Sequence, residues 1–149
     1  MIGCGNPARS DDGAGVEVIR RLKARPAAPG VEYIDAGTSG MDVMFRVRGA
    51  AHVLIVDACR SGSEPGALFR LPAREAMTAT EHGYSLHGMR WDHALYAGHK
   101  MFGDAFIDQA EVILIEAHHV AFGLELSAAV QLAVCKVVDL VEGVVASHA

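Results

Sequence analysis

The sequence predicts an α/β fold: a three-layer, doubly wound sheet of about five strands, flanked by helices on both faces. Two observations favour this class, namely short β-branched runs that end on carboxylates and helical patterns that alternate with them along the chain. Apolar residues make up 51% of the sequence and few of them are aromatic, which suits a core of strands and packed helices. Because no linker, repeat or low-complexity segment interrupts the 149 residues, we expect a single domain over 1–149.

Five segments are expected to form the strands. The runs His52-Val-Leu-Ile-Val-Asp57 and Glu111-Val-Ile-Leu-Ile-Glu116 are continuously apolar rather than alternating, which is typical of strands buried on both faces of a sheet. Weaker strand candidates are 1–4, 31–35 and 67–71, the last of which follows a Pro-Gly turn signal.

Helical spacing of apolar residues is clearest from Ser127 to Val145, where valines recur on one face and Ser127 is a suitable N-cap. Further helices are expected at 15–24, 40–47 and 86–102. The irregular stretch 72–84 precedes the last of these, and a loop of that length beside an α/β sheet is more often functional than idle.

Charge and cysteine content narrow the function classes. A net charge of −5 argues against non-specific binding to nucleic acid or to an anionic membrane, because either would require a basic face. No apolar run approaches the roughly 20 residues of a spanning helix, and the N-terminus lacks the pattern of a secretory signal. The odd, widely spaced set Cys4, Cys59 and Cys135 does not suit a disulfide framework. We therefore expect a soluble, reduced, cytoplasmic protein.

Three predicted strands end on carboxylates: Asp35, Asp57 and Glu116. In open α/β sheets, ligands bind outside the carboxyl ends of the strands, so these residues are expected on the functional edge. The loop Gly5-Asn-Pro-Ala-Arg-Ser-Asp-Asp-Gly13 opens at the same edge after the first strand.

A dinucleotide site is one interpretation of this edge. The segment Gly3-Cys-Gly5-Asn-Pro-Ala8 matches a loose dinucleotide fingerprint, with Asp35 as the ribose partner. However, Asp11 and Asp12 occupy the helix start and would repel a pyrophosphate, and Pro7 removes one backbone donor. This interpretation is kept only as a minor alternative.

A metal site is the second interpretation. If Asp11 caps the helix, Asp12 is left over as a ligand, and Asp57 and His87 would aim at the same place. Two carboxylates and one imidazole suit Ni²⁺ or Zn²⁺ and leave positions open for substrate or water. Taken alone, each residue also has a purely structural explanation. His118-His119 would add ligands only if two adjacent side chains converged.

A thiol peptidase built on Cys59 and His87 is a third interpretation, although a cysteine is often only a small buried hydrophobe.

Several motifs, taken in order, resemble the hydrogenase maturation endopeptidases, which trim the C-terminus of nickel-loaded [NiFe]-hydrogenase large subunits. They are Gly3-Cys-Gly-Asn-Pro-Ala-Arg-Ser-Asp-Asp-Gly-Ala-Gly15, Asp35-Ala-Gly-Thr-Ser-Gly40, Leu54-Ile-Val-Asp-Ala58, Glu64-Pro-Gly66 and Ser85-Leu-His87. The match is collinear over nearly the whole chain. Departures from the family pattern are the short first strand, Ala36 in place of a glycine, and Ala117 where proline is common.

The resemblance implies a nickel-binding trio of Asp12, Asp57 and His87, with Asp35 as an additional catalytic candidate that orients water or substrate backbone. It also implies that nickel is supplied by the substrate, the large-subunit precursor. Because two carboxylates and one histidine are available within a single chain, we expect a monomer to suffice. A nickel-sensing chaperone that docks without cutting would share every ligand and stays open as an alternative. We further expect Trp91-Asp-His93 and His99 to form a surface for one hydrogenase partner.

Overall fold

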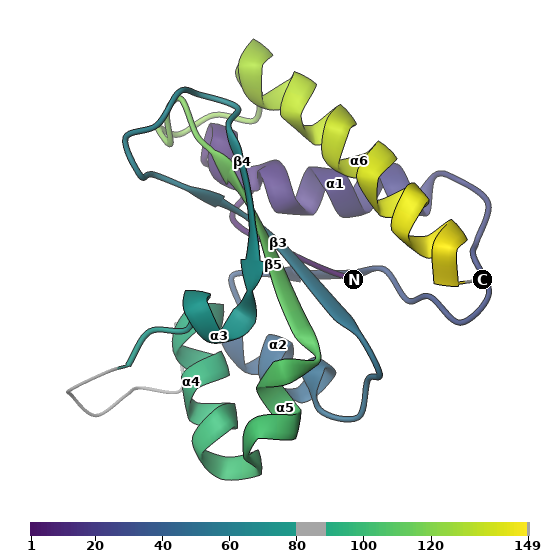
Figure 1. Cartoon of the computed structure of the whole chain (residues 1–149). Coiled ribbons are helices and arrows are strands. Elements are labelled where there is room, and N and C mark those ends of the chain that lie inside the picture. The colour runs from purple at the N-terminus through teal and green to yellow at the C-terminus, as the bar shows by residue number, and fades with distance from the viewer. Residues whose placement is uncertain (80–88, 149) are drawn as a thin grey trace.

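The computed structural model describes residues 1–79 and 89–148, and its strands form one five-stranded sheet in the order β2-β1-β3-β5-β4. The neighbouring strands β3, β5 and β4 are labelled in Figure 1. Four strands run parallel, whereas β4 pairs with β5 antiparallel at one edge. The strands are β1 (Ile2–Cys4), β2 (Ile34–Gly37), β3 (Val53–Cys59), β4 (Leu68–Pro72) and β5 (Ala110–Glu116). All five predicted strands are confirmed, with bounds that shift by a few residues at most.

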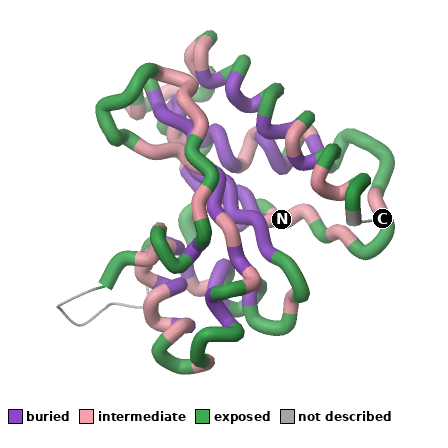
Figure 2. Tube along the Cα trace, in the orientation of Figure 1, coloured by how far each residue is buried: buried purple, intermediate pink, exposed green. Residues whose placement is uncertain are grey.

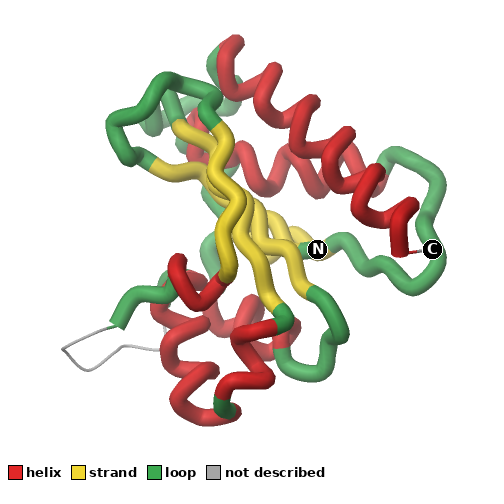
Figure 3. The backbone as a smooth tube through the Cα atoms, in the orientation of Figure 1, coloured by secondary structure: helices red, strands yellow, loops and turns green. Residues whose placement is uncertain are grey.

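Helices cover both faces of this sheet, which confirms the three-layer α/β prediction (Figures 1 and 3). One face carries α1 (Ala14–Lys23) and α6 (Ala128–His148), and the short 3-10 helix η1 (Ser10–Gly13) leads into α1. The other face carries α2 (Gly40–Val47), α3 (Ala73–Ala76), α4 (Trp91–Phe102) and α5 (Asp104–Asp108). No helix within the described ranges has both the length and the apolar character that a membrane crossing needs.

Two apolar cores lie on either side of the sheet, and both are formed by its alternating side chains. Val56 faces the helices α1 and α6, whereas its neighbour Ile55 faces α2 and α4. Buried residues therefore run through the centre of the molecule, and exposed residues follow the outer sides of the helices (Figure 2).

One predicted helix begins later than its apolar pattern indicates. The expected helix at 86–102 starts only at Trp91, because Arg90 is extended (φ −71°, ψ 156°). Just before it, the carbonyl of Met89 accepts a hydrogen bond from the backbone N–H of Gly40, at 2.9 Å. Met89 is therefore buried against the start of α2 without being helical. His87 lies outside the described residues.

Candidate active site at the carboxyl edge of the sheet

Two carboxylates line one pocket where the parallel strands end. Asp57 lies near the end of β3 and Asp12 lies in η1, after the loop that follows β1. The pocket is lined by Cys4, Gly5, Asp12, Gly37, Thr38, Ser39, Gly40, Asp57, Arg90 and Trp91. The structure therefore brings together two of the predicted site residues, from segments 45 positions apart, and places them on the predicted edge of the sheet.

Close backbone approach at two glycines puts Asp12 beside the sheet. A Cβ on Gly15, near the start of α1, would lie 2.2 Å from the carbonyl oxygen of Val56, so only glycine lets the helix start rest on β3. Gly5 has a φ of +124°, and a Cβ there would lie 1.8 Å from the carbonyl oxygen of Asp12. The glycines of the first motif thus serve the approach of Asp12 to β3.

Asp57 is a buried carboxylate with one protein donor on each oxygen. Its Oδ2 accepts from the indole Nε1 of Trp91 at 2.6 Å, and its Oδ1 accepts from the backbone N–H of Ala58 at 2.8 Å. Burial raises the pKa of Asp57 to about 6, and nearby Asp12 adds to this rise, while the two hydrogen bonds and Arg90 oppose it. Asp57 therefore changes charge near neutral pH, unlike an ordinary aspartate.

Asp12 is partly exposed, and its Oδ2 accepts a hydrogen bond from the backbone N–H of Asn6 at 3.0 Å. This bond orients the carboxylate without burying it. Among the described residues, no group of three His, Cys, Asp or Glu side chains is arranged to hold a metal ion.

Asp11 does not cap the helix that follows it, so that prediction is wrong: the caps of η1 and α1 form no side-chain hydrogen bond. Its fully buried carboxylate instead accepts from the backbone N–H and hydroxyl of Ser127 at 2.7 and 2.9 Å. It also accepts from the backbone N–H groups of His118 and His119. Burial alone would raise the pKa of Asp11, but these hydrogen bonds outweigh it and lower the pKa. Asp11 therefore joins η1 to the start of α6.

Glu116 and Asp35 lie at the predicted edge but support the backbone. The buried Glu116 carboxylate accepts from the backbone N–H groups of Ser61 and Gly62 and from the Ser61 hydroxyl. Burial opposes ionisation, but these bonds lower the pKa of Glu116 to about 2. The exposed Asp35 accepts from the backbone N–H of Gly37 at 2.9 Å, at the start of one pocket wall.

The backbone N–H groups of the loop after β1 are already used within the protein. Every N–H from Gly5 to Asp12 has an internal acceptor, apart from Pro7, which has no N–H. For example, Ser10 donates to the carbonyl of Gly123 at 2.8 Å. A phosphate nest needs free donors, so this loop does not support the dinucleotide interpretation.

Cys59 is a poor nucleophile in this environment. Its thiol donates to Glu116 Oε2 at 3.3 Å, and burial together with this carboxylate raises its pKa to about 12. A thiolate is the reactive form, so the geometry does not favour the thiol peptidase.

Trp91 is buried rather than exposed, so the predicted partner surface that included it is wrong in that respect. Arg90 and the 37–40 wall of the pocket were not among the predicted site residues, although the wall follows Asp35 within the motif Asp35-Ala-Gly-Thr-Ser-Gly40.

Comparisons with known proteins place this architecture in a family. A family model described as hydrogenase maturation protease matches residues 16–144. The chain belongs to the hydrogenase maturation protease family. The resemblance seen in the sequence motifs is thereby confirmed.

Individual relatives show how far the likeness extends. The Hydrogenase 2 maturation protease of Escherichia coli is 32% identical over 77 residues, which cover 50% of this chain and 47% of that protein. Coenzyme F420 hydrogenase subunit delta of Methanothermobacter thermautotrophicus is 36% identical over 81 residues, covering 50% and 51%. The chain thus spans about half the length of these curated relatives in the matched segments.

The fold of a solved family member extends over the whole chain. The hydrogenase maturating endopeptidase of E. coli superimposes with a TM-score of 0.77 at 20% identity, covering 99% of this chain and 91% of the other. This family protease therefore shares the five-stranded α/β architecture on which Asp12 and Asp57 meet.

Proposed function

We propose that this protein is a cytoplasmic endopeptidase that removes the C-terminal extension of a [NiFe]-hydrogenase large-subunit precursor once nickel has been inserted. The observation that carries the proposal is the meeting of Asp12 and Asp57 in one pocket, in a chain of the hydrogenase maturation protease family. Acidic side chains from two separate segments, one of them buried with a raised pKa, are typical of functional rather than structural sites.

Nickel would enter this pocket as part of the substrate. Asp12 and Asp57 would bind it through carboxylate oxygens, and His87 would add an imidazole, a donor set that suits a borderline divalent ion. Asp57 fits this role because, among the described residues, each of its oxygens accepts one hydrogen bond and keeps a lone pair for a cation. Bound nickel would polarise the scissile carbonyl or lower the pKa of an attacking water.

The remaining pocket residues would prepare the site for that ion. Arg90, at the pocket wall, balances part of the negative charge of the two aspartates. Asp35 would shape the 37–40 wall of the pocket. Its carboxylate accepts a hydrogen bond from the N–H of Gly37, which fixes the turn that leads to Gly40. One chain carries every proposed ligand, so a monomer suffices for cleavage.

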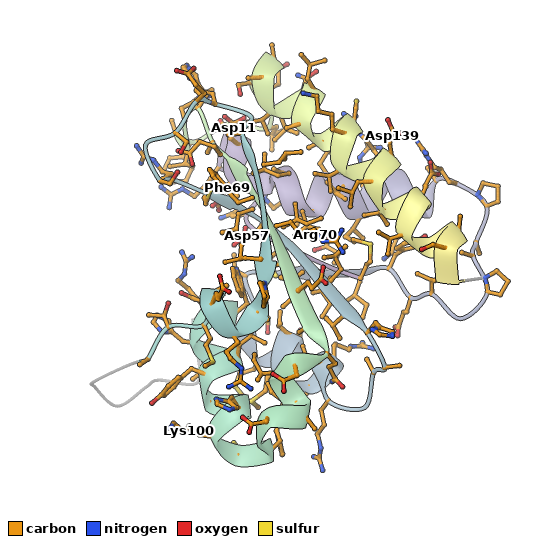
Figure 4. All side chains as sticks on the ribbon, in the orientation of Figure 1. Asp11, Asp57, Phe69, Arg70, Lys100 and Asp139 are labelled. Atoms are coloured by element: carbon orange, nitrogen blue, oxygen red, sulfur yellow. The ribbon has the colours of Figure 1, made fainter. Side chains whose placement is uncertain are left out.

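Intact mass spectrometry of the matching precursor tests the proposal. The precursor is incubated with the protein before and after nickel loading, in parallel with Asp12→Asn and Asp57→Asn variants. Asp139→Asn is the matched control, since it removes one carboxylate from an exposed site on α6 away from the pocket (Figure 4). We expect a discrete C-terminal peptide to be lost only from nickel-loaded precursor, and only with the wild type and the control.

A stable complex in which the precursor keeps its full mass would instead support the non-cleaving chaperone. Equal cleavage of nickel-free precursor would contradict the role of nickel, and equal cleavage by Asp57→Asn would contradict the proposed site.

A further inference from the structure

The start of α4 carries a buried tryptophan whose polar atom is directed at the candidate site. Trp91 is 6% exposed and Asp57 is 7% exposed, and 2.6 Å separate the indole Nε1 from Asp57 Oδ2. A bond between a neutral donor and an ionised carboxylate in a water-poor place is among the stronger hydrogen bonds in proteins. Neither motif quoted for Asp57 and His87 includes this residue.

The indole is itself held in place by the backbone before it. The Gly40 N–H donates to the carbonyl of Met89 at 2.9 Å, and a Cβ on Gly40 would lie 2.2 Å from that oxygen. The segment that presents Trp91 is therefore packed directly against the start of α2. Arg90, which lies between Met89 and Trp91 in the chain, is exposed, has an extended backbone and makes an ion pair with Asp92.

The chemistry of indole decides what Trp91 can do there. Its N–H donates and cannot accept, so Trp91 offers no lone pair to a metal ion and does not serve as an acid or base in catalysis. It can only act through Asp57, by fixing the side-chain rotamer and occupying one lone pair of Oδ2. With Ala58 N–H on Oδ1, the remaining lone pairs then have defined directions.

We propose that Trp91 is a positioning residue for Asp57, which holds this carboxylate in the orientation that it presents to the nickel-loaded substrate. The role in cleavage rests on the proposed peptidase function. The proposed orientation of Asp57 by Trp91 does not depend on the peptidase function.

The first test measures the hydrogen bond without any substrate. Trp91 is the only tryptophan of the chain, so a ¹⁵N-labelled sample gives a single indole N–H signal in a two-dimensional NMR spectrum. We expect a downfield proton that exchanges slowly with solvent, and an upfield shift in Asp57→Asn, whose folding is checked in the same spectrum. An indole signal that is the same in both proteins overturns the proposal.

The second test separates positioning from packing. Trp91→Phe keeps an aromatic ring and removes the donor, whereas Gln109→Met removes an equally short side-chain bond, from Gln109 Nε2 to the Val47 carbonyl at 2.6 Å. Gln109 precedes β5, at the opposite edge of the sheet from the pocket. Loss of one hydrogen bond to a charged group corresponds to roughly a tenfold effect. We therefore expect kcat for precursor cleavage to fall about tenfold in Trp91→Phe, with KM little changed.

The control should lower the unfolding temperature through the loss of its hydrogen bond, while kcat stays at the wild-type value. Equal kcat in Trp91→Phe and wild type, or an equal fall in both variants, overturns the role of Trp91 in cleavage. A wild-type protein that leaves nickel-loaded precursor intact overturns the peptidase function instead, and the indole signal then decides alone whether Trp91 orients Asp57.

Discussion

Replacing Asp11 and Asp12 one at a time should separate stability from activity at adjacent positions. Asp11 is fully buried and accepts four hydrogen bonds, whereas Asp12 is partly exposed and accepts one, from Asn6. Asp11→Ala removes the acceptor of both bonds from Ser127. Two lost bonds to a buried charge give about 3 kcal/mol of destabilisation.

For a chain of this length, that loss lowers the unfolding temperature by about 10 °C, since each kcal/mol corresponds to roughly 2–4 °C. Asp12→Ala should cost about 1 kcal/mol at most, because its single bond lies near solvent. The effect on cleavage of the precursor should be reversed. Asp12→Ala should abolish cleavage, whereas folded Asp11→Ala should keep a measurable part of the cleavage activity.

Thermal unfolding and intact mass spectrometry on the same samples provide the assay. Asp11→Asn is a control that keeps the side-chain volume. Its amide N–H₂ would face hydrogen-bond donors, so this variant should lose nearly as much stability as Asp11→Ala. The lowered pKa of Asp11 means that its contribution is complete above the usual aspartate range and is lost as the pH falls below it. An Asp11→Ala protein within about 1 kcal/mol of wild type would refute the assignment of Asp11 to stability.

Three further outcomes follow from the buried groups. For Asp57, the pKa of about 6 exceeds the unfolded value of 3.8, so the free energy of unfolding should fall by about 2 kcal/mol from pH 4 to pH 6. In urea unfolding measured across this pH range, Asp57→Asn should weaken that dependence on pH. Glu116→Gln should lower the unfolding temperature at pH 7 and weaken acid destabilisation below pH 4.5, because the lowered pKa of Glu116 stabilises the fold only while it is ionised. Cys59→Ala should cleave the precursor at the wild-type rate, and slow alkylation of Cys59 at pH 7 should leave cleavage intact; loss of cleavage in either experiment would restore the thiol mechanism.

Much of the fold followed from local patterns in the sequence. The continuous β-branched runs of β3 and β5 and the valine stripe of α6 require burial wherever they lie, so their type and approximate bounds were predictable. The edge that carries Asp12 and Asp57 was predictable too, because parallel strands with helical crossovers gather their carboxyl ends. His87 lies outside the described residues, so its place in the trio stays a prediction.

The errors concern side chains whose partners are distant in sequence. Trp91 looked like a surface aromatic because nothing nearby in the chain accepts its N–H; the acceptor, Asp57, lies 34 positions away. Asp11 looked like a helix cap for the same reason, although its partner Ser127 lies 116 positions away. Local propensity cannot identify such pairs, because tertiary packing creates them.

The contact between Asp11 and Ser127 also sets an order of events during folding. Closing a loop of 116 residues costs more chain entropy than any local contact, so this contact forms late. Until α6 docks, the η1 segment that carries Asp11 and Asp12 lacks its hydrogen bonds to Ser127. In a chain still emerging from the ribosome, we therefore expect the segment next to the candidate site to gain its last anchor only once α6 has been synthesised.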